Sequence, residues 1–143
     1  MDLIWTEQLS VGNAILDSDH KELFELAKSI DSAAKARDRP TLTLALKQFR
    51  ACMGRHFLNE ELFAHTLNIP FAKHRQDHQN MQAEIDLTMQ EMEKNSLVAI
   101  YVIEHYAQFL RDWLTKHLAE EDMPMKSMLQ ARPYDFKIDG VSL

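Results

Sequence analysis

Four segments of the chain carry apolar residues at the spacing of one helix face, and short polar breaks separate them. The segments are about Asp19–Lys35, about Pro40–His65, Pro70–Met92 and, after Asn95-Ser96, Ala99–Trp113. Asp17 and Ser18 precede the first segment as N-caps, and Pro40 suits the first turn of the second helix. The pattern therefore predicts four amphipathic helices.

Helices joined by such short breaks pack as antiparallel neighbours, so we predict an all-α fold, an up-down-up-down four-helix bundle. The whole chain, 1–143, is expected to form a single domain. We divide it into a non-helical arm at 1–16, a bundle at about 17–122 and a tail at 123–143. Ile4 and Trp5 of the arm can pack on the bundle. Pro124 disturbs the helix, and 133–143 reads as an irregular or short extended segment.

Composition supports this fold class and excludes several partners. The 143 residues are 45% hydrophobic, and only 3 Gly and 4 Pro argue against a β-sandwich or barrel with its many turns. A net charge of −6 leaves no basic excess to neutralise phosphates, so nucleic acid is not an expected partner.

The cysteine count and the apolar runs bear on location. Cys52 is the single cysteine, which excludes an internal disulfide and favours a reducing compartment. No apolar run approaches the roughly 20 residues that span a bilayer, so no membrane partner is expected. The first residues lack the basic and apolar regions of a secretory signal. We expect a cytoplasmic protein.

The positions of the 7 histidines carry the chemical signal. Two pairs stand four residues apart, His56 with Glu60 and His74 with His78, and each pair continues the apolar stripe of its helix. His20 precedes the stripe of the first helix, and His117 follows that of the fourth. All four helices thus direct imidazoles into one interior. A lone histidine of this kind is more often a hydrogen-bonded core residue.

A metal explains the set better than packing does, because five buried imidazoles and a carboxylate are costly without a cation. Imidazole with carboxylate suits iron, manganese or zinc, and the shortage of thiolates excludes iron–sulfur and cysteine–zinc sites. The ligands are too many for one ion with an open position, whereas two ions bridged by carboxylates would use them all. Spacing from His117 leaves both Glu121 and Asp122 as candidates. His65 and His105 lie off the stripes, at the surface or behind the ligands.

At these residues the sequence resembles the hemerythrins, and specifically the bacterial hemerythrins. The matching elements span roughly residues 5 to 123: Trp5, Ser10-Val11-Gly12, Asp17-x-x-His20, His56-Phe57-x-x-Glu60-Glu61, His74-x-x-x-His78 and Trp113-Leu114-x-x-His117-x-x-x-x-Asp122.

The resemblance implies a non-heme di-iron site with an additional oxo or hydroxo bridge. By that similarity one iron is held by three histidines and the other by two, and two carboxylates bridge them. The first set is His74, His78 and His117, the second is His20 and His56, and the bridges are Glu60 and Asp122. The resemblance thus selects Asp122 over Glu121. A local unwinding after His117 would make the five-residue spacing workable.

An iron with only two histidines has room for a small exogenous molecule. We predict reversible binding of dioxygen, for storage, delivery or sensing, and expect no enzymatic role. Phe57, Trp113 and Leu114 are expected to line the dioxygen pocket while also packing in the core. One alternative is a di-iron redox enzyme (peroxidase, ferroxidase or nitric-oxide handling), for which the sequence indicates no substrate channel. The other is a signalling module that reaches a protein partner through the arm or tail.

Overall fold

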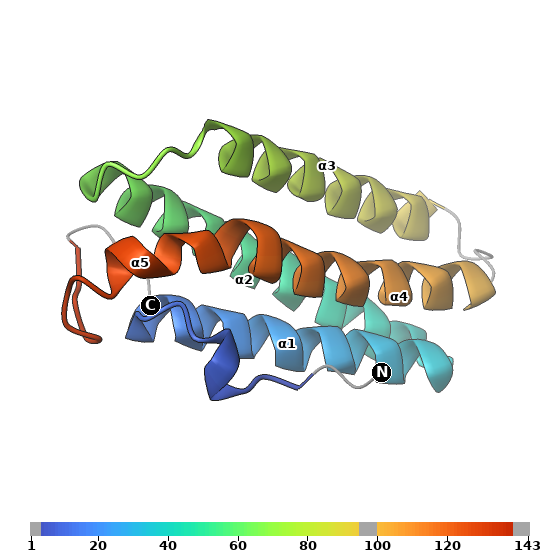
Figure 1. Cartoon of the computed structure of the whole chain (residues 1–143). Coiled ribbons are helices and arrows are strands. Elements are labelled where there is room, and N and C mark those ends of the chain that lie inside the picture. The colour runs from blue at the N-terminus through green and yellow to red at the C-terminus, as the bar shows by residue number, and fades with distance from the viewer. Residues whose placement is uncertain (1–3, 95–99, 139–143) are drawn as a thin grey trace.

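The computed structural model describes residues 4–94 and 100–138, and within these ranges it contains four long helices and no strand. The long helices are α1 (Ala14–Lys35), α2 (Arg39–Thr66), α3 (Ala72–Lys94) and α4 (Ile100–His117). They run alternately up and down the bundle, with α3 and α1 flanking α4 in the view of Figure 1. The predicted four-helix bundle is confirmed. The expected cap at Asn95-Ser96 lies outside the described residues.

Short helical turns flank the bundle at both ends of the chain. They are the 3-10 turn η1 (Glu7–Leu9), the π-helical turn η2 (Leu118–Asp122), the 3-10 turn η3 (Met123–Met125) and the short helix α5 (Lys126–Leu129). Pro124 lies inside η3, where the α-helical path is interrupted as predicted. The described part of the tail beyond residue 132 contains no helix or strand.

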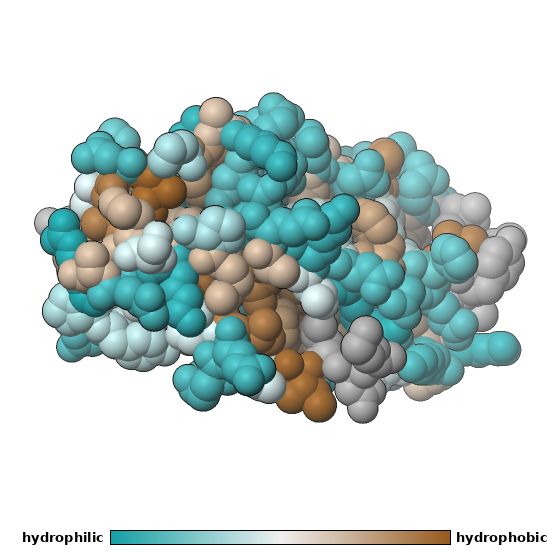
Figure 2. Space-filling view, in the orientation of Figure 1, coloured by the Kyte–Doolittle hydropathy of each residue, from teal (hydrophilic) through white to brown (hydrophobic). Residues whose placement is uncertain are grey.

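The apolar stripes meet in the bundle interior and form its core. Its largest side chains below 2% exposure are Phe49, Phe63, Leu16, Leu23, Ile30, Leu42, Leu46, Met53, Met81, Ile85, Leu110 and Leu118. Hydrophilic residues cover most of the outer face seen in Figure 2. None of the described helices combines the length and apolarity needed to cross a bilayer.

The first helix begins earlier than its sequence suggested. Asn13 caps α1, because its side-chain oxygen accepts hydrogen bonds from the backbone amides of Ile15 and Leu16 at 3.0 and 3.3 Å. The predicted cap at Asp17 or Ser18 is therefore wrong, and the predicted end of the arm at residue 16 is three residues too late. The arm ends at residue 13 and itself contains the turn η1.

Asp17 instead joins the arm, α1 and the tail. Its buried carboxylate accepts hydrogen bonds from the Ser10 hydroxyl (2.5 Å), the Val11 amide (2.8 Å) and the Tyr134 hydroxyl (2.7 Å). In the arm, Trp5 packs on the core as expected, but Ile4 is 61% exposed. The tail is thus fixed beside the start of α1.

Candidate metal centre

The structure brings all seven predicted ligands together in the bundle interior. Each is at most 6% exposed, and they come from all four helices and η2: His20, His56, Glu60, His74, His78, His117 and Asp122. Because they sit on inward faces of rigid helices, their convergence follows from the packing that buries the apolar stripes.

The ligand atoms fall into two groups that share both carboxylates. One group is Glu60, His74, His78, His117 and Asp122, and the other is His20, His56, Glu60 and Asp122. Within each group the ligand atoms lie within 4.8 Å of one another. This is the arrangement expected of two cations bridged by two carboxylates.

Asp122 spans the two groups with its two oxygens. Oδ1 lies 2.8 Å from Nε2 of His74 and 3.1 Å from Nε2 of His117, whereas Oδ2 lies 3.0 Å from Nε2 of His20. A carboxylate oriented this way offers one oxygen to each neighbouring cation.

Glu60 spans the groups in the same way. Its Oε1 contacts Nε2 of His56, and its Oε2 lies 3.1 Å from Nε2 of His74. Oε1 also lies 3.8 Å from Nε2 of His78. Glu60 and Asp122 therefore reach both histidine sets from different helices.

Three imidazole nitrogens meet on the larger side of the site. Nε2 of His117 lies 3.2 Å from Nε2 of His74 and 3.1 Å from Nε2 of His78. A neutral imidazole carries one N–H, so three such nitrogens cannot all satisfy one another by hydrogen bonding. A shared cation satisfies all three lone pairs at once.

Other buried polar atoms of the site form no hydrogen bond of good geometry with the described residues, although several lie close to a ligand of opposite charge. They are Nδ1 and Nε2 of His20, Nε2 of His56, both oxygens of Glu60 and Oδ1 of Asp122. Such atoms cost free energy in a core, whereas a nitrogen and oxygen donor set of this kind suits iron, manganese or zinc. The residues present therefore fit a metal centre.

The electrostatics of the metal centre favour positive charge between its carboxylates and imidazoles. Burial raises the pKa of both carboxyls, but the histidines outweigh it: the pKa of Glu60 falls to about 2, and that of Asp122 lies well below its usual range. Burial lowers the pKa of His56 and His74, yet the carboxylates raise these values to about 10 and about 9. Burial and the neighbouring imidazoles lower the pKa of His78 to about 3. Two ionised carboxylates thus require protons or metal cations beside them.

The turn η2 explains why Asp122 can join His117 across five residues. The backbone amide of Met123 donates to the carbonyl of Leu118, five residues earlier, which widens the helix to a π-turn. A wider turn places residues five apart on one face, whereas an α-helix would favour Glu121. The predicted unwinding after His117 is confirmed, and Glu121 instead forms an ion pair with Lys73.

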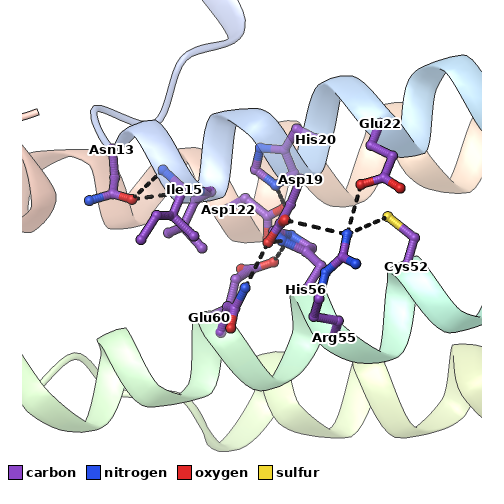
Figure 3. Close-up of polar contacts among 12 residues, drawn as sticks. Asn13, Ile15, Asp19, His20, Glu22, Cys52, Arg55, His56, Glu60 and Asp122 are labelled. Carbon is purple, nitrogen blue, oxygen red and sulfur yellow. Dashed lines mark hydrogen bonds and ion pairs between the residues drawn. The ribbon is translucent and has the colours of Figure 1, made fainter. Parts of the chain in front are cut away.

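Asp19 and Asn59 hold His56 from behind, as Figure 3 shows for Asp19. Nδ1 of His56 lies 3.0 Å from Oδ2 of Asp19, and the Asn59 amide donates to the same oxygen at 3.0 Å. Donation from Nδ1 leaves the Nε2 lone pair facing the centre. Sequence reasoning missed both residues, because their contact joins α1 to α2 and the spacing within either helix does not show it.

Arg55 extends this arrangement to the surface. One of its terminal nitrogens lies 4.0 Å from Oδ1 of Asp19 and 2.7 Å from Oε2 of Glu22, whose side chain is half exposed. Asp19 is thus a buried carboxylate with a histidine on one side and a guanidinium on the other.

Aromatic rings cover the three-histidine side. Phe57 stacks on His78 with ring centroids 3.6 Å apart, and Trp113 stacks on His117 at 4.5 Å. Leu114 is 2% exposed on α4. Their part in a dioxygen pocket stays a prediction. The off-stripe residues His65 and His105 are exposed, away from the ligands as predicted.

Comparison with models of known protein families identifies the family of this chain. The sequence model described as "Hemerythrin HHE cation binding domain" matches residues 11–129. The chain belongs to the hemerythrin family. That span contains every ligand named above, so the family's cation-binding function and the geometry agree.

Curated relatives and solved structures that are similar to this chain are also hemerythrins or hemerythrin-like proteins. A "Bacteriohemerythrin" of Campylobacter jejuni is 30% identical over 117 residues, covering 80% of this chain and 85% of the relative. A "Hemerythrin-like protein" of Naegleria gruberi is 27% identical over 126 residues, covering 87% and 92%. A crystal structure of a hemerythrin leucine-to-tyrosine mutant aligns with a TM-score of 0.76 at 20% identity, covering 91% of this chain and 99% of that one. This last likeness concerns the fold alone.

Proposed function

We propose that this member of the hemerythrin family binds dioxygen reversibly at two iron ions in the bundle core. The observation that carries the proposal is the inequality of the two ligand groups. One offers five side chains and the other only four, including the two that are shared. A metal with fewer protein ligands retains a position for a small exogenous molecule.

In this proposal each histidine set would hold one iron, and Glu60 and Asp122 would be shared between the two. When bound, the ferrous pair supplies the coordination position and the two electrons that dioxygen binding requires. Membership of the hemerythrin family supports iron over manganese or zinc in this proposal.

The chain's own residues would make that binding reversible. Leu114, Phe57 and the bundle core exclude water, which slows loss of the ferrous state. Leu114 is aliphatic and donates no proton, so this side chain favours release of dioxygen unchanged. The Asp19 contact fixes the orientation of His56 and the lone pair it presents.

Iron content and an optical spectrum of the reduced protein test the proposal. We expect iron near two per chain and a new, stable absorption after exposure to air. Rapid conversion to the ferric form, with no stable oxygenated species, would instead support a redox enzyme or a signalling module. Protein that is purified with zinc alone and takes up no iron would contradict the proposal.

A further inference from the structure

One cationic side chain lies behind the histidine set with fewer ligands. A terminal nitrogen of Arg55 lies 4.0 Å from Oδ1 of Asp19 and 2.7 Å from Oε2 of Glu22, and it donates to the Cys52 sulfur at 3.7 Å. Figure 3 shows this guanidinium between the two carboxylates, with Asp19 in turn contacting His56. The positive charge of Arg55 thus lies two contacts away from the metal centre.

Burial distinguishes the two carboxylates that Arg55 contacts. The Glu22 side chain is 50% exposed, so water screens that ion pair. The Asp19 side chain is only 6% exposed, and its other oxygen lies 3.0 Å from Nδ1 of His56. Opposite charges interact more strongly where water is excluded. Asp19 is therefore the contact through which the charge of Arg55 reaches a metal ligand.

A second arginine of α2 shows what is particular to Arg55. Arg50 is 32% exposed, against 30% for Arg55, and its Nε donates to Asp86 of α3 at 2.6 Å. Among the described residues, neither member of that pair contacts a ligand of the metal centre. The buried Nε of Arg55, by contrast, forms no hydrogen bond with the described part of the chain. Ion pairing between helices does not explain this placement, because an unpaired buried N–H group costs free energy.

We propose that Arg55 is a positioning residue that acts through Asp19 and His56 to favour the ferrous over the ferric state of the metal centre. The inference rests on the proposed function, in which the two irons must stay ferrous to bind dioxygen. In autoxidation each ferrous ion loses one electron to dioxygen, which takes two protons from solvent and leaves as hydrogen peroxide. Arg55 slows this loss without touching the irons or dioxygen.

Two electrostatic effects of Arg55 act in the same direction. A carboxylate that accepts a hydrogen bond from a histidine makes the imidazole a stronger electron donor, and a stronger donor stabilises the ferric state more than the ferrous state. The guanidinium draws on the charge of Asp19 and so limits the donation from His56. Its own positive charge also disfavours the more positive state of a nearby metal. Loss of Arg55 should therefore make the irons easier to oxidise.

The proton on Nδ1 of His56 tests the link from Arg55 without reference to iron or dioxygen. We would load the full-length protein with zinc and record the NMR resonance of this proton. Arg55→Gln should move the resonance downfield, because Asp19 then accepts the hydrogen bond more strongly. Arg55→Lys should restore most of the original position, and the matched control Arg50→Gln should leave it unchanged. No shift in Arg55→Gln, or an equal shift in Arg50→Gln, would overturn the proposal.

The midpoint potential of the iron-loaded protein tests the consequence for the metal. Redox titration under argon should give a lower midpoint for Arg55→Gln than for Arg50→Gln or the unmodified protein. Autoxidation of Arg55→Gln in air should be faster by about tenfold, the lower end of the effect of losing a partner behind a ligand. A midpoint that is unchanged or higher in Arg55→Gln would overturn the proposal.

Zinc affinity separates this role from a purely structural one. Competition with a chelator should show no loss of zinc affinity in Arg55→Gln, because removing a positive charge does not repel a cation. Weaker zinc binding with an unchanged midpoint would show that Arg55 only supports the fold, and would overturn the proposal. A shifted His56 resonance in protein that takes up zinc but no iron would support the link from Arg55 to His56 and contradict the proposed function alone.

Discussion

His56 and Asp19 form a buried pair in which Nδ1 of the imidazole lies 3.0 Å from a carboxylate oxygen, on the side of the ring away from the metal centre. Both side chains are at most 6% exposed. The pair links α1 to α2 directly behind the histidine set with fewer ligands. It therefore controls the ligand beside the proposed dioxygen position.

Replacing Asp19 with Asn should weaken iron binding without emptying the site. The amide can still accept a hydrogen bond, but the negative charge that makes His56 a stronger ligand is lost. We expect iron affinity to fall by about 10- to 100-fold, measured by competition with a chelator. Glu22→Gln is the matched control, because it removes a half-exposed carboxylate on the same helix and should leave affinity unchanged. Equal loss in both variants would contradict a specific role for Asp19.

Removing a bridging or terminal ligand should reduce both iron content and stability. Glu60→Ala or His78→Ala is expected to lower bound iron well below two per chain and to lower the thermal midpoint, because other buried polar groups lose their cation. Metal analysis and calorimetry measure the two effects. His65→Ala and His105→Ala should retain full iron and an unchanged spectrum. Normal iron in either ligand variant would show that the ligand set is wrong.

Leu114→Ala should open the proposed pocket while leaving all seven ligands in place. Iron should stay near two per chain, and the cavity should cost about 2–5 kcal/mol of stability. We expect faster autoxidation and faster azide entry, followed by stopped-flow absorbance. Leu110→Ala is the control, since it creates a cavity at another fully buried leucine of α4. Equal autoxidation rates in the Leu114→Ala and Leu110→Ala variants would show that Leu114 does not control access to the metal centre.

The thiol of Cys52 should be unreactive in the folded protein. Burial, with the nearby Glu22 carboxylate, raises the pKa of Cys52 to about 12 from 9.0. The thiolate is the reactive form, so alkylation at pH 8 should be slow until urea unfolds the chain. Because the folded pKa is raised, the neutral thiol's contribution to stability is present below pH 9 and is lost as pH approaches 12. Alkylation of the native protein at the unfolded rate would contradict this.

Helix periodicity explains how far the sequence alone could predict the site. His56 and Glu60 continue a stripe that also holds Met53, so their inward direction follows from core packing. The sequence pattern predicts the start of α1 too late, because Asp17 resembles a cap but is bound by residues as distant as Tyr134. Such a contact depends on the folded chain and leaves no local pattern.

The same limit applies to the residues around the ligands. Asp19 precedes His20 directly, yet its partner His56 is 37 residues away on another helix. Spacing alone does not distinguish Glu121 from Asp122 as the ligand. The π-turn that favours Asp122 departs from regular helical periodicity. Resemblance to the family supplied that choice, and the structure gives its physical reason.

Repeated oxygenation and deoxygenation of the iron-loaded protein tests whether dioxygen binds reversibly at the two irons. Reduced protein would be exposed to a known amount of dioxygen in a closed cell, then returned to argon, with uptake and absorbance recorded together. We expect uptake of one dioxygen for each pair of irons, release under argon, and return of the reduced spectrum over repeated cycles. Consumption of dioxygen that argon does not reverse, with the ferric spectrum left behind, would contradict reversible binding.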